Sequence, residues 1–274
     1  MTGQTLDGGK ELWLITLSFT ESNSSTIQIG FPVLPTAGSP THFDVLRSWL
    51  LDCDNNHKCR PKDPVELPTR LINVGTIQQP TIHLYETTPG EAGRYLALSH
   101  PWGDPANHPH FCTYVTNIDA HKENIDFEKL PATFKDAVIT TRELGFRYLW
   151  IDSICIIQGP DGDFNIQASR MEDVFSSAFC VIAASSSTGQ CDGFLKPRKP
   201  RTHLALRREN KEPFFICDHI DDFNEDVLEG RLCKRAWVLQ ERALSHRTIY
   251  FTDGQTYWEC GEGVRCETLT KMHK

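Results

Sequence analysis

The stretch from Leu144 to Gln158 carries a single acidic side chain, Asp152, inside an almost continuous apolar run. Such a run, bounded by a glycine and rich in aromatic and β-branched residues, is typical of a strand buried on both faces. A carboxylate there must be hydrogen-bonded, paired or placed at a strand end facing a cleft, since an isolated buried charge is costly. Asp152 and the adjacent Ser153 are therefore either structural or part of a site, where a carboxylate would serve acid–base or electrostatic catalysis.

A second group of chemically capable side chains follows the predicted strand 95–100. It comprises Ser99, His100, Trp102, Gly103 and Asp104. Ligands bind at the carboxyl ends of strands in open parallel sheets, so these residues predict a polar pocket. In the alternative interpretation Ser99 and Asp104 cap a turn while Trp102 closes the core. The sequence leaves both interpretations open.

The third group lies on a predicted helix within 235–242. Trp237 and Glu241 are one turn apart and share a face, with Gln240 beside them. An amphipathic helix with an exposed Glu–Arg pair explains this pattern as well, and without further information it is the favoured interpretation.

Cysteine and histidine spacing raises the question of a metal. Cys53, His57 and Cys59 lie close together, and Cys260 and Cys266 form a distant pair. The gaps differ from the usual short spacing of paired zinc-ligating cysteines, so no metal site is predicted. Phosphate-binding loops, nucleophile elbows and zinc-protease helices are also missing from the sequence.

Composition narrows the class of protein. The chain has 274 residues, a net charge of −8 and an apolar share of 39%. The acidic balance argues against a surface for duplex nucleic acid or anionic membranes. The ten cysteines are scattered, several in apolar contexts, which fits reduced thiols better than a secreted disulfide scaffold. The short apolar segment 12–19 is neither a signal peptide nor a membrane span, so we expect a soluble, cytoplasmic protein.

Hydrophobic periodicity predicts the elements that must position these groups. Strand, helix, strand, helix and strand alternate between Tyr95 and Ala184, which favours a largely parallel sheet with right-handed crossovers. The other predicted elements are a hairpin of 12–19 and 26–33, a helix at 43–51, strands at 70–74 and 81–85, strands near 204 and 214–216, a helix at 234–244 and a hairpin at 248–259. We expect one α/β domain with additions at both ends.

Three blocks in this order resemble the heterokaryon incompatibility (HET) domain family of filamentous fungi. They are RYLALSHPWGD, then LPATFKDAVITTRELGFRYLWIDSICIIQ, then RAWVLQERALSHRTIYF followed by YWEC. Upstream segments WLLDCDNNHKC and LPTRLINVG are also similar to the family, so the resemblance runs from about Trp49 to Cys260. The resulting division is an N-terminal extension at 1–42, an upstream helix and strands at 43–94, the HET domain at 95–266 and a tail at 267–274.

The resemblance implies a domain that triggers programmed cell death in nonself recognition. It also implies a distant likeness to TIR domains, which have a flavodoxin-like fold and include enzymes that hydrolyse NAD at the bond to nicotinamide. That chemistry needs a carboxylate near the ribose and an aromatic ring to stack on. By this resemblance the candidate carboxylates are Asp152, Asp104, Glu172 and Glu241, and the candidate aromatics are Trp102 and Trp237.

One position departs from the family pattern. After Asp163 and Phe164 the family usually has a glutamate, and this chain has Gln167. If that glutamate is catalytic, the chain is a weakened or inactive enzyme, because glutamine keeps the shape, which leaves binding possible, and loses the charge. The alternative to an NAD hydrolase is a non-enzymatic signalling module that works by self-association or through an upstream signalling partner.

Overall fold

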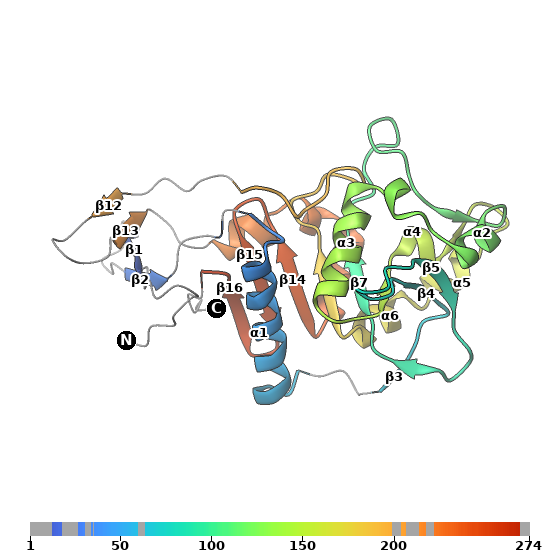
Figure 1. Cartoon of the computed structure of the whole chain (residues 1–274), viewed down its shortest axis with the longest axis horizontal. Coiled ribbons are helices and arrows are strands. Elements are labelled where there is room, and N and C mark those ends of the chain that lie inside the picture. Colours follow the sequence, from blue (N-terminus) through green and yellow to red (C-terminus); the bar gives the residue numbers. More distant parts are fainter. Residues whose placement is uncertain are drawn as a thin grey trace.

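The computed structural model describes residues 13–17, 27–30, 34, 36–59, 64–198, 204–206, 214–217 and 222–268. Its centre is an eight-stranded sheet in the order β16-β15-β14-β11-β7-β9-β4-β5 (Figure 1). The strands are β4 (Arg70–Asn73), β5 (His83–Glu86), β7 (Leu96–Ser99), β9 (Tyr148–Trp150), β11 (Cys180–Ala183), β14 (Arg247–Phe251), β15 (Thr256–Cys260) and β16 (Gly263–Cys266). The fold is therefore mixed α/β, as predicted.

The middle of this sheet is parallel and its flanks are antiparallel. Strands β9, β7, β11 and β14 run parallel to their neighbours within this group. On one side β4 and β5 pair antiparallel, and on the other β15 and β16 do so. The upstream strands β4 and β5 thus form part of the sheet itself.

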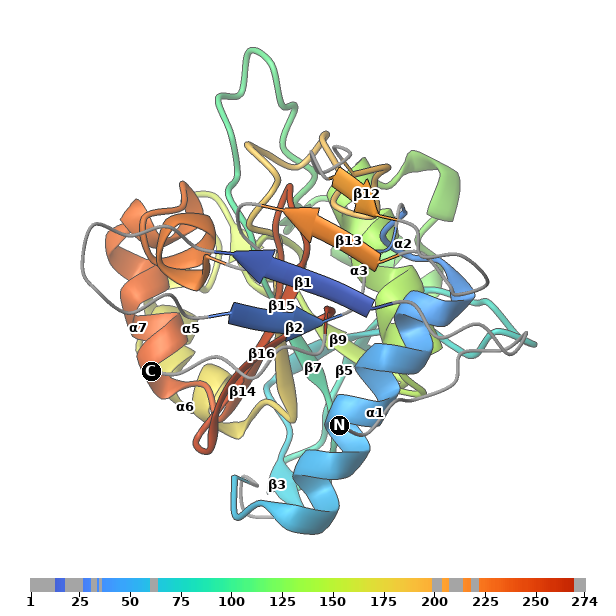
Figure 2. The same ribbon diagram turned by 90° about the vertical axis from the view of Figure 1, so that its left-hand side faces the viewer.

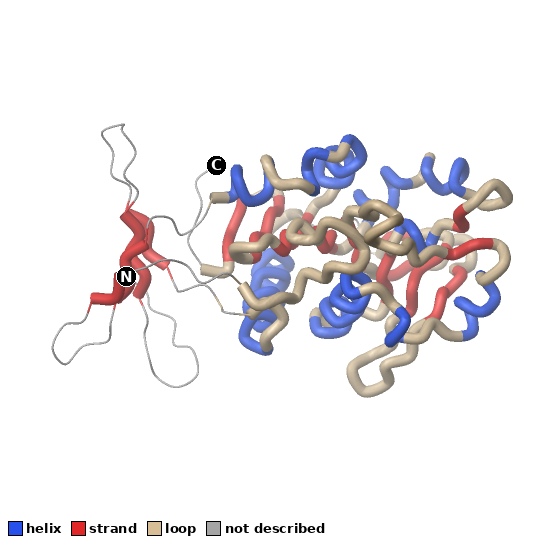
Figure 3. Tube along the Cα trace, turned by 90° about the horizontal axis from the view of Figure 1, so that it is seen from above, coloured by secondary structure: helices blue, strands red, loops and turns tan. Residues whose placement is uncertain are grey.

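Helices cover both faces of the sheet. One face carries α6 (Met171–Ser177) and α7 (Ala236–Leu244), and the other carries α1 (Pro40–Asn56) and α3 (Ala132–Glu143), as Figure 2 shows and the view from above in Figure 3 confirms. The side chain of Arg47 joins the last two by donating to the Glu143 carbonyl oxygen at 2.7 Å. The remaining helices are α2 (Ile118–Glu123), α4 (Asp152–Cys155), α5 (Phe164–Ala168), η1 (Phe127–Lys129), η2 (Asn224–Leu228) and η3 (Leu232–Lys234).

Smaller strand groups complete the chain. A four-stranded sheet in the order β12-β13-β1-β2 lies beyond the β16 end of the main sheet (Figure 1). Its strands are β1 (Trp13–Leu17), β2 (Ile27–Gly30), β12 (Leu204–Leu206) and β13 (Phe214–Cys217). Two-stranded pairs join β3 (Val65–Glu66) to β6 (Ala92–Gly93) and β8 (Thr113–Tyr114) to β10 (Ile157–Gln158). Among the described residues, none of the helices combines the length and apolar content that a bilayer crossing needs.

Two predicted elements differ from the structure. The apolar run around Asp152 is not one strand, because β9 ends at Trp150 and the one-turn helix α4 follows. The second of the two helices predicted between Tyr95 and Ala184, whose apolar pattern covers 163–178, is broken into α5 and α6 at Ser169 and Arg170. Both differences arise because an apolar pattern marks burial without fixing the backbone path.

The core of the parallel strands is closely packed. Ile182 in β11 is 0% exposed between β7 and β14. Replacing Ile182 with alanine should lower the free energy of unfolding by about 2–5 kcal/mol, because it removes buried methyl groups and leaves a cavity. Chemical denaturation measures this effect. The matched change Ile77→Ala, at a position 57% exposed, should cost at most about 0.5 kcal/mol; equal losses at both sites would contradict the assigned core.

Candidate active site at the carboxyl edge of the sheet

The ends of two neighbouring parallel strands bring the first candidate residues together. Ser99 is the last residue of β7, and Asp152 opens α4 directly after β9. Because β7 and β9 pair in parallel, the segments that follow them leave the sheet at the same edge. The polar groups of both segments therefore meet at the carboxyl edge of the sheet, where open α/β sheets bind ligands.

Asp152 is held in place by two hydrogen bonds to its carboxylate. Trp102 Nε1 donates to Oδ2 at 2.7 Å, and the Ser153 backbone N–H donates to Oδ1 at 2.7 Å. The side chain of Asp152 remains 26% exposed. Its carboxylate is thus fixed in direction and still reachable from solvent, which satisfies the requirement that a carboxylate in an apolar run be hydrogen-bonded at a strand end.

His100 lies beneath this carboxylate as a buried imidazole. Its Nδ1 is 3.9 Å from Asp152 Oδ1, and its ring stands edge-on to Phe134 at 5.0 Å. Burial lowers the pKa of His100 to about 4, which Asp152 opposes and which Arg235 and His110 reinforce. The ring is therefore neutral at physiological pH. Its Nε2 is buried without a hydrogen-bond partner among the described residues.

Glu241 is the group of this cluster whose carboxyl changes its protonation state near neutral pH. Burial raises the pKa of its carboxyl to about 7, repulsion from Asp152 adds to the shift, and Ser99 and Arg235 oppose it. A carboxyl group that is about half ionised at neutral pH suits acid–base work or the stabilisation of developing positive charge. The sequence alone favoured an exposed Glu–Arg pair for this helix. Arg242 instead pairs with Glu259 at 2.9 Å, while Glu241 faces the cluster.

Other predicted residues have local roles or lie elsewhere. Gly103 has φ +81° and lets the loop approach His108, whose ring would be 2.6 Å from an added Cβ. The Asp104 side chain accepts from the Ala106 N–H at 3.0 Å, as the turn-capping interpretation predicts. Glu172 is exposed on α6. Trp237 and Gln240 are on α7, but their side chains lie outside the described part of the chain.

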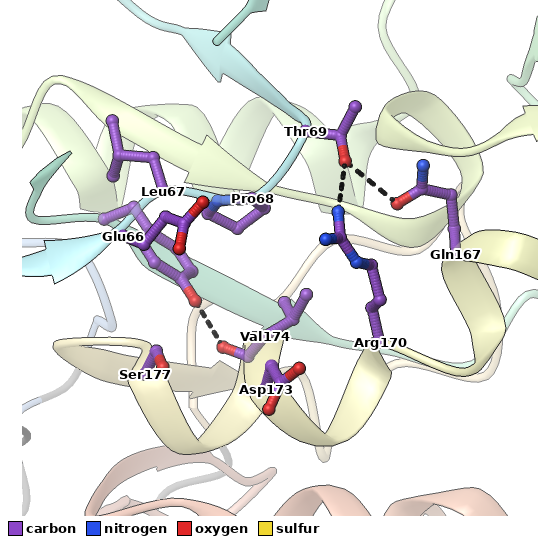
Figure 4. Close-up of a pocket in the computed structure, with 10 residues that line it drawn as sticks. Glu66, Leu67, Pro68, Thr69, Gln167, Arg170, Asp173, Val174 and Ser177 are labelled. Atoms are coloured by element: carbon purple, nitrogen blue, oxygen red, sulfur yellow. Dashed lines mark hydrogen bonds between the residues drawn. The ribbon is translucent and has the colours of Figure 1, made fainter. Parts of the chain in front are cut away.

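Gln167 belongs to a separate pocket of about 330 Å³ between the β3–β4 segment and the α5–α6 region (Figure 4). Its amide donates to Asp163 Oδ2 at 3.0 Å, and its oxygen accepts from Thr69 Oγ1 at 3.4 Å. Arg70 binds the same Asp163 oxygen. Within the described residues, no hydrogen bond or ion pair joins Gln167 directly to Asp152 or Glu241.

Gln167→Glu should therefore destabilise the protein without creating activity. The new carboxylate would lose a donated hydrogen bond and face Asp163, whose pKa is lowered despite burial by its hydrogen bonds to Arg70 and the Ile157 N–H. We expect a loss of about 1–3 kcal/mol at pH 7 that shrinks in acid, measured by denaturation. The exposed change Gln78→Glu serves as control. A gain in turnover would instead move the reacting site to this pocket.

The sequence did not predict the roles of two arginines at this site. Arg235 donates from its guanidinium to the His100 carbonyl oxygen at 2.6 Å and so ties the start of α7 to the end of β7. Arg70 is 5% exposed and donates to the Cys155 carbonyl oxygen at 2.8 Å. This hydrogen bond fixes the end of α4 to β4. Arg235 lies near the start of the helix predicted at 234–244, and the sequence gives no signal for its role, since its partner is a backbone oxygen.

Comparisons with known proteins bear on the three sequence blocks that resemble the HET family. Residues 95–241 match the family described as Heterokaryon incompatibility protein (HET). The chain is 31% identical over 94 residues to heterokaryon incompatibility protein 6, OR allele, of Neurospora crassa, covering 32% of this chain and 14% of that relative. The chain thus spans only a small part of the relative's length. No solved structure gives a significant match.

Proposed function

Because the chain belongs to the heterokaryon incompatibility protein family, with more than half of it inside the family match, we propose that it is a cell-death effector in fungal nonself recognition. We propose further that the Asp152–Glu241 cluster binds NAD or a related dinucleotide and hydrolyses it to nicotinamide and ADP-ribose. The observation that carries this proposal is the meeting of Ser99, Asp152 and the mostly buried Glu241 at the carboxyl edge of the sheet, where burial raises the pKa of Glu241.

The topology supports a nucleotide as ligand. The four parallel strands lie in the order β9-β7-β11-β14, so the first in the chain lies between the second and the third. Flavodoxin-like folds, to which TIR domains belong, have this order and bind nucleotides where it reverses. Here that point is the junction of β7 and β11, next to Ser99 and His100. Fold likeness alone gives no activity, so the chemistry must come from the cluster.

The cluster supports cleavage of a glycosidic bond. Ionised Glu241 would hold the ribose hydroxyls and stabilise the positive charge that develops as the bond to nicotinamide breaks. Nicotinamide leaves with the bonding electron pair as a neutral base and needs no proton. Water then adds to the ribose carbon, and its proton passes to the carboxylate. Asp152 and the partly exposed Trp102 ring would line the pocket. Asp152 would contribute its negative charge, and Trp102 would stack on a ring of the ligand.

The direct test uses the purified chain with NAD. Calorimetry measures binding, and chromatography measures the nicotinamide and ADP-ribose released. Carba-NAD, in which the ribose ring oxygen is replaced by carbon, should bind without being cleaved. A folded protein that shows neither binding nor turnover would contradict the proposal. Light scattering on the same samples addresses the other class of function: cell killing that follows self-association, with no nucleotide consumed, would favour a non-enzymatic signalling module.

A further inference from the structure

Four side chains that no part of the proposed activity uses meet at the other edge of the sheet. Cys53 is in the last turns of α1, His57 caps that helix, Cys59 follows it, and Cys260 ends β15. Their ligand atoms, three sulfurs and one ring nitrogen, all lie within 4.8 Å of one another. Cys260 Sγ and His57 Nδ1, from residues 203 positions apart, are separated by 3.5 Å.

These distances suit a tetrahedral zinc ion. With zinc–sulfur bonds of about 2.3 Å and zinc–nitrogen bonds of about 2.0 Å, neighbouring ligand atoms of a tetrahedron lie roughly 3.5–3.8 Å apart. The separation of Cys260 and His57 already falls in that range, and the other pairs, all within 4.8 Å, would have to close by about 1 Å at most. Thiolate and imidazole donors select zinc over calcium or magnesium, which prefer oxygen.

The surroundings of the four residues also fit a bound ion. Three thiolates and zinc leave one net negative charge, and the fully buried guanidinium of Arg247 lies near enough to act on Cys53. Gly261 interacts through its backbone N–H with Cys59, and an added Cβ there would be 3.2 Å from Cys59 Sγ. Backbone donors and a nearby cation are the outer partners that stabilise thiolate ligands.

We propose that Cys53, His57, Cys59 and Cys260 bind one structural zinc ion that fastens α1 to the end of β15. Four protein ligands leave no open position for water or substrate, which is the mark of a structural rather than a catalytic site. The prediction of no metal relied on pairing Cys260 with Cys266, whereas in the structure Cys266 Sγ lies 2.6 Å from Thr268 Oγ1. Cys260 is instead the fourth member of the Cys53 group.

The position of the site indicates what the ion would do. Cys260 pairs with Arg247, the first residue of the parallel strand β14, so the site is at the amino edge of the sheet, away from Asp152. Around it, Arg247 pairs with Asp54 at 2.7 Å, Arg265 with Asp52 at 2.6 Å, and the rings of Trp49 and Trp258 lie 6.5 Å apart. Zinc would add a covalent-strength link to this helix–sheet contact and contribute directly to folding.

The test begins with the metal content of the whole chain, purified under reducing conditions without chelator and without a histidine tag. Elemental analysis should find about one zinc per chain. Cobalt(II) exchanged into the protein should show the visible absorption of a tetrahedral thiolate site, and a strong chelator should lower the melting temperature. A folded wild-type protein that holds no zinc, even after incubation with zinc, would overturn the proposal.

Variants separate this site from adventitious binding. His57→Gln and Cys59→Ser should lose the zinc, and both residues lie outside regular secondary structure, so the changes are mild for the fold. Cys266→Ser is the matched control, because it changes a buried cysteine of the same hairpin and should keep the ion. Zinc retained equally by all three variants would contradict the site. A disulfide among Cys53, Cys59 and Cys260 in freshly prepared protein, seen by mass spectrometry, would do so as well.

Discussion

Replacing Glu241 with glutamine should lower NAD cleavage by about 10²–10³-fold while making the protein more stable above neutral pH. The loss of rate follows because the amide keeps the shape of the carboxyl group and removes its negative charge. For the same reason, the wild-type rate should rise with pH until Glu241 has ionised, near pH 7, and the variant should lack this rise. Nicotinamide release measured from pH 5 to 9 checks both statements.

The same variant should gain stability although it loses activity. The pKa of Glu241 is raised by burial from 4.5 to about 7, so between these values the folded state holds a proton that the unfolded state has released. Stability from this group is therefore complete below pH 4.5 and falls by up to about 3 kcal/mol as the pH passes 7. Glu241→Gln removes that fall. Denaturation at pH 5 and pH 8 should show a much larger advantage for the variant at pH 8, because only a small part of the fall has occurred at pH 5.

His100 complicates the wild-type profile in a predictable way. Burial lowers its pKa from 6.5 to about 4, so its contribution to stability rises with pH across that interval. In the wild type the two slopes oppose each other between pH 4.5 and 6.5, and Glu241→Gln should expose the rising slope of His100. The exposed change Glu123→Gln should leave the profile unaltered. A variant that is both inactive and destabilised at pH 8 would contradict the assigned burial of Glu241.

Asp152→Asn should cost about 10²-fold in NAD cleavage and about 1–3 kcal/mol of stability. The carboxylate accepts from two donors, Trp102 Nε1 and the Ser153 N–H, each at 2.7 Å. An asparagine amide has one oxygen, so one of these donors would face an NH₂ group. Turnover, and killing in a fungal host, measure the functional loss.

Trp102→Phe provides the matched comparison for Asp152. It removes the indole N–H and keeps the charge, so its effect on turnover should be smaller than that of Asp152→Asn. Combining both changes should give less than the sum of the single losses, because the residues share one hydrogen bond. If instead Asp152→Asn leaves killing intact while changes that break self-association abolish it, the chain acts as a signalling module.

The sequence predicted the elements of this fold better than their connections. The strands β7, β11 and β14 and the helices α3 and α7 were expected near their observed places, because their apolar runs and helical apolar patterns are clear. Pro131 and Gly145 also bound α3, and the Asp253-Gly254 turn follows β14. The antiparallel entry of β4 and β5 into the sheet was missed, since strand polarity depends on distant pairing. The one-turn helix α4 was missed because a short apolar run gives no usable period.

The candidate site was predictable to a similar extent. Ser99, His100, Trp102, Asp152 and Ser153 follow strands that the sequence located, and parallel pairing brings them together. The burial of Glu241 was not predictable, because a helical wheel cannot tell which face meets a sheet and which meets solvent. The separation of Gln167 from this cluster was not predictable either, because its partners Thr69 and Asp163 are known only from the structure.

The interior place of β14 also bears on how the chain is made. This strand pairs with β11 inside the sheet, yet it begins only at Arg247, shortly after Glu241 in α7. A ribosome releases residues in order, so the sheet stays open beside β11 until nearly all of the described chain has emerged. Under the proposed function, an incomplete product ending before Glu241 would have Asp152 without its partner. Under that same proposal, toxicity would begin only after synthesis has passed that point, and the cell that makes the protein would be protected from its own truncated chains.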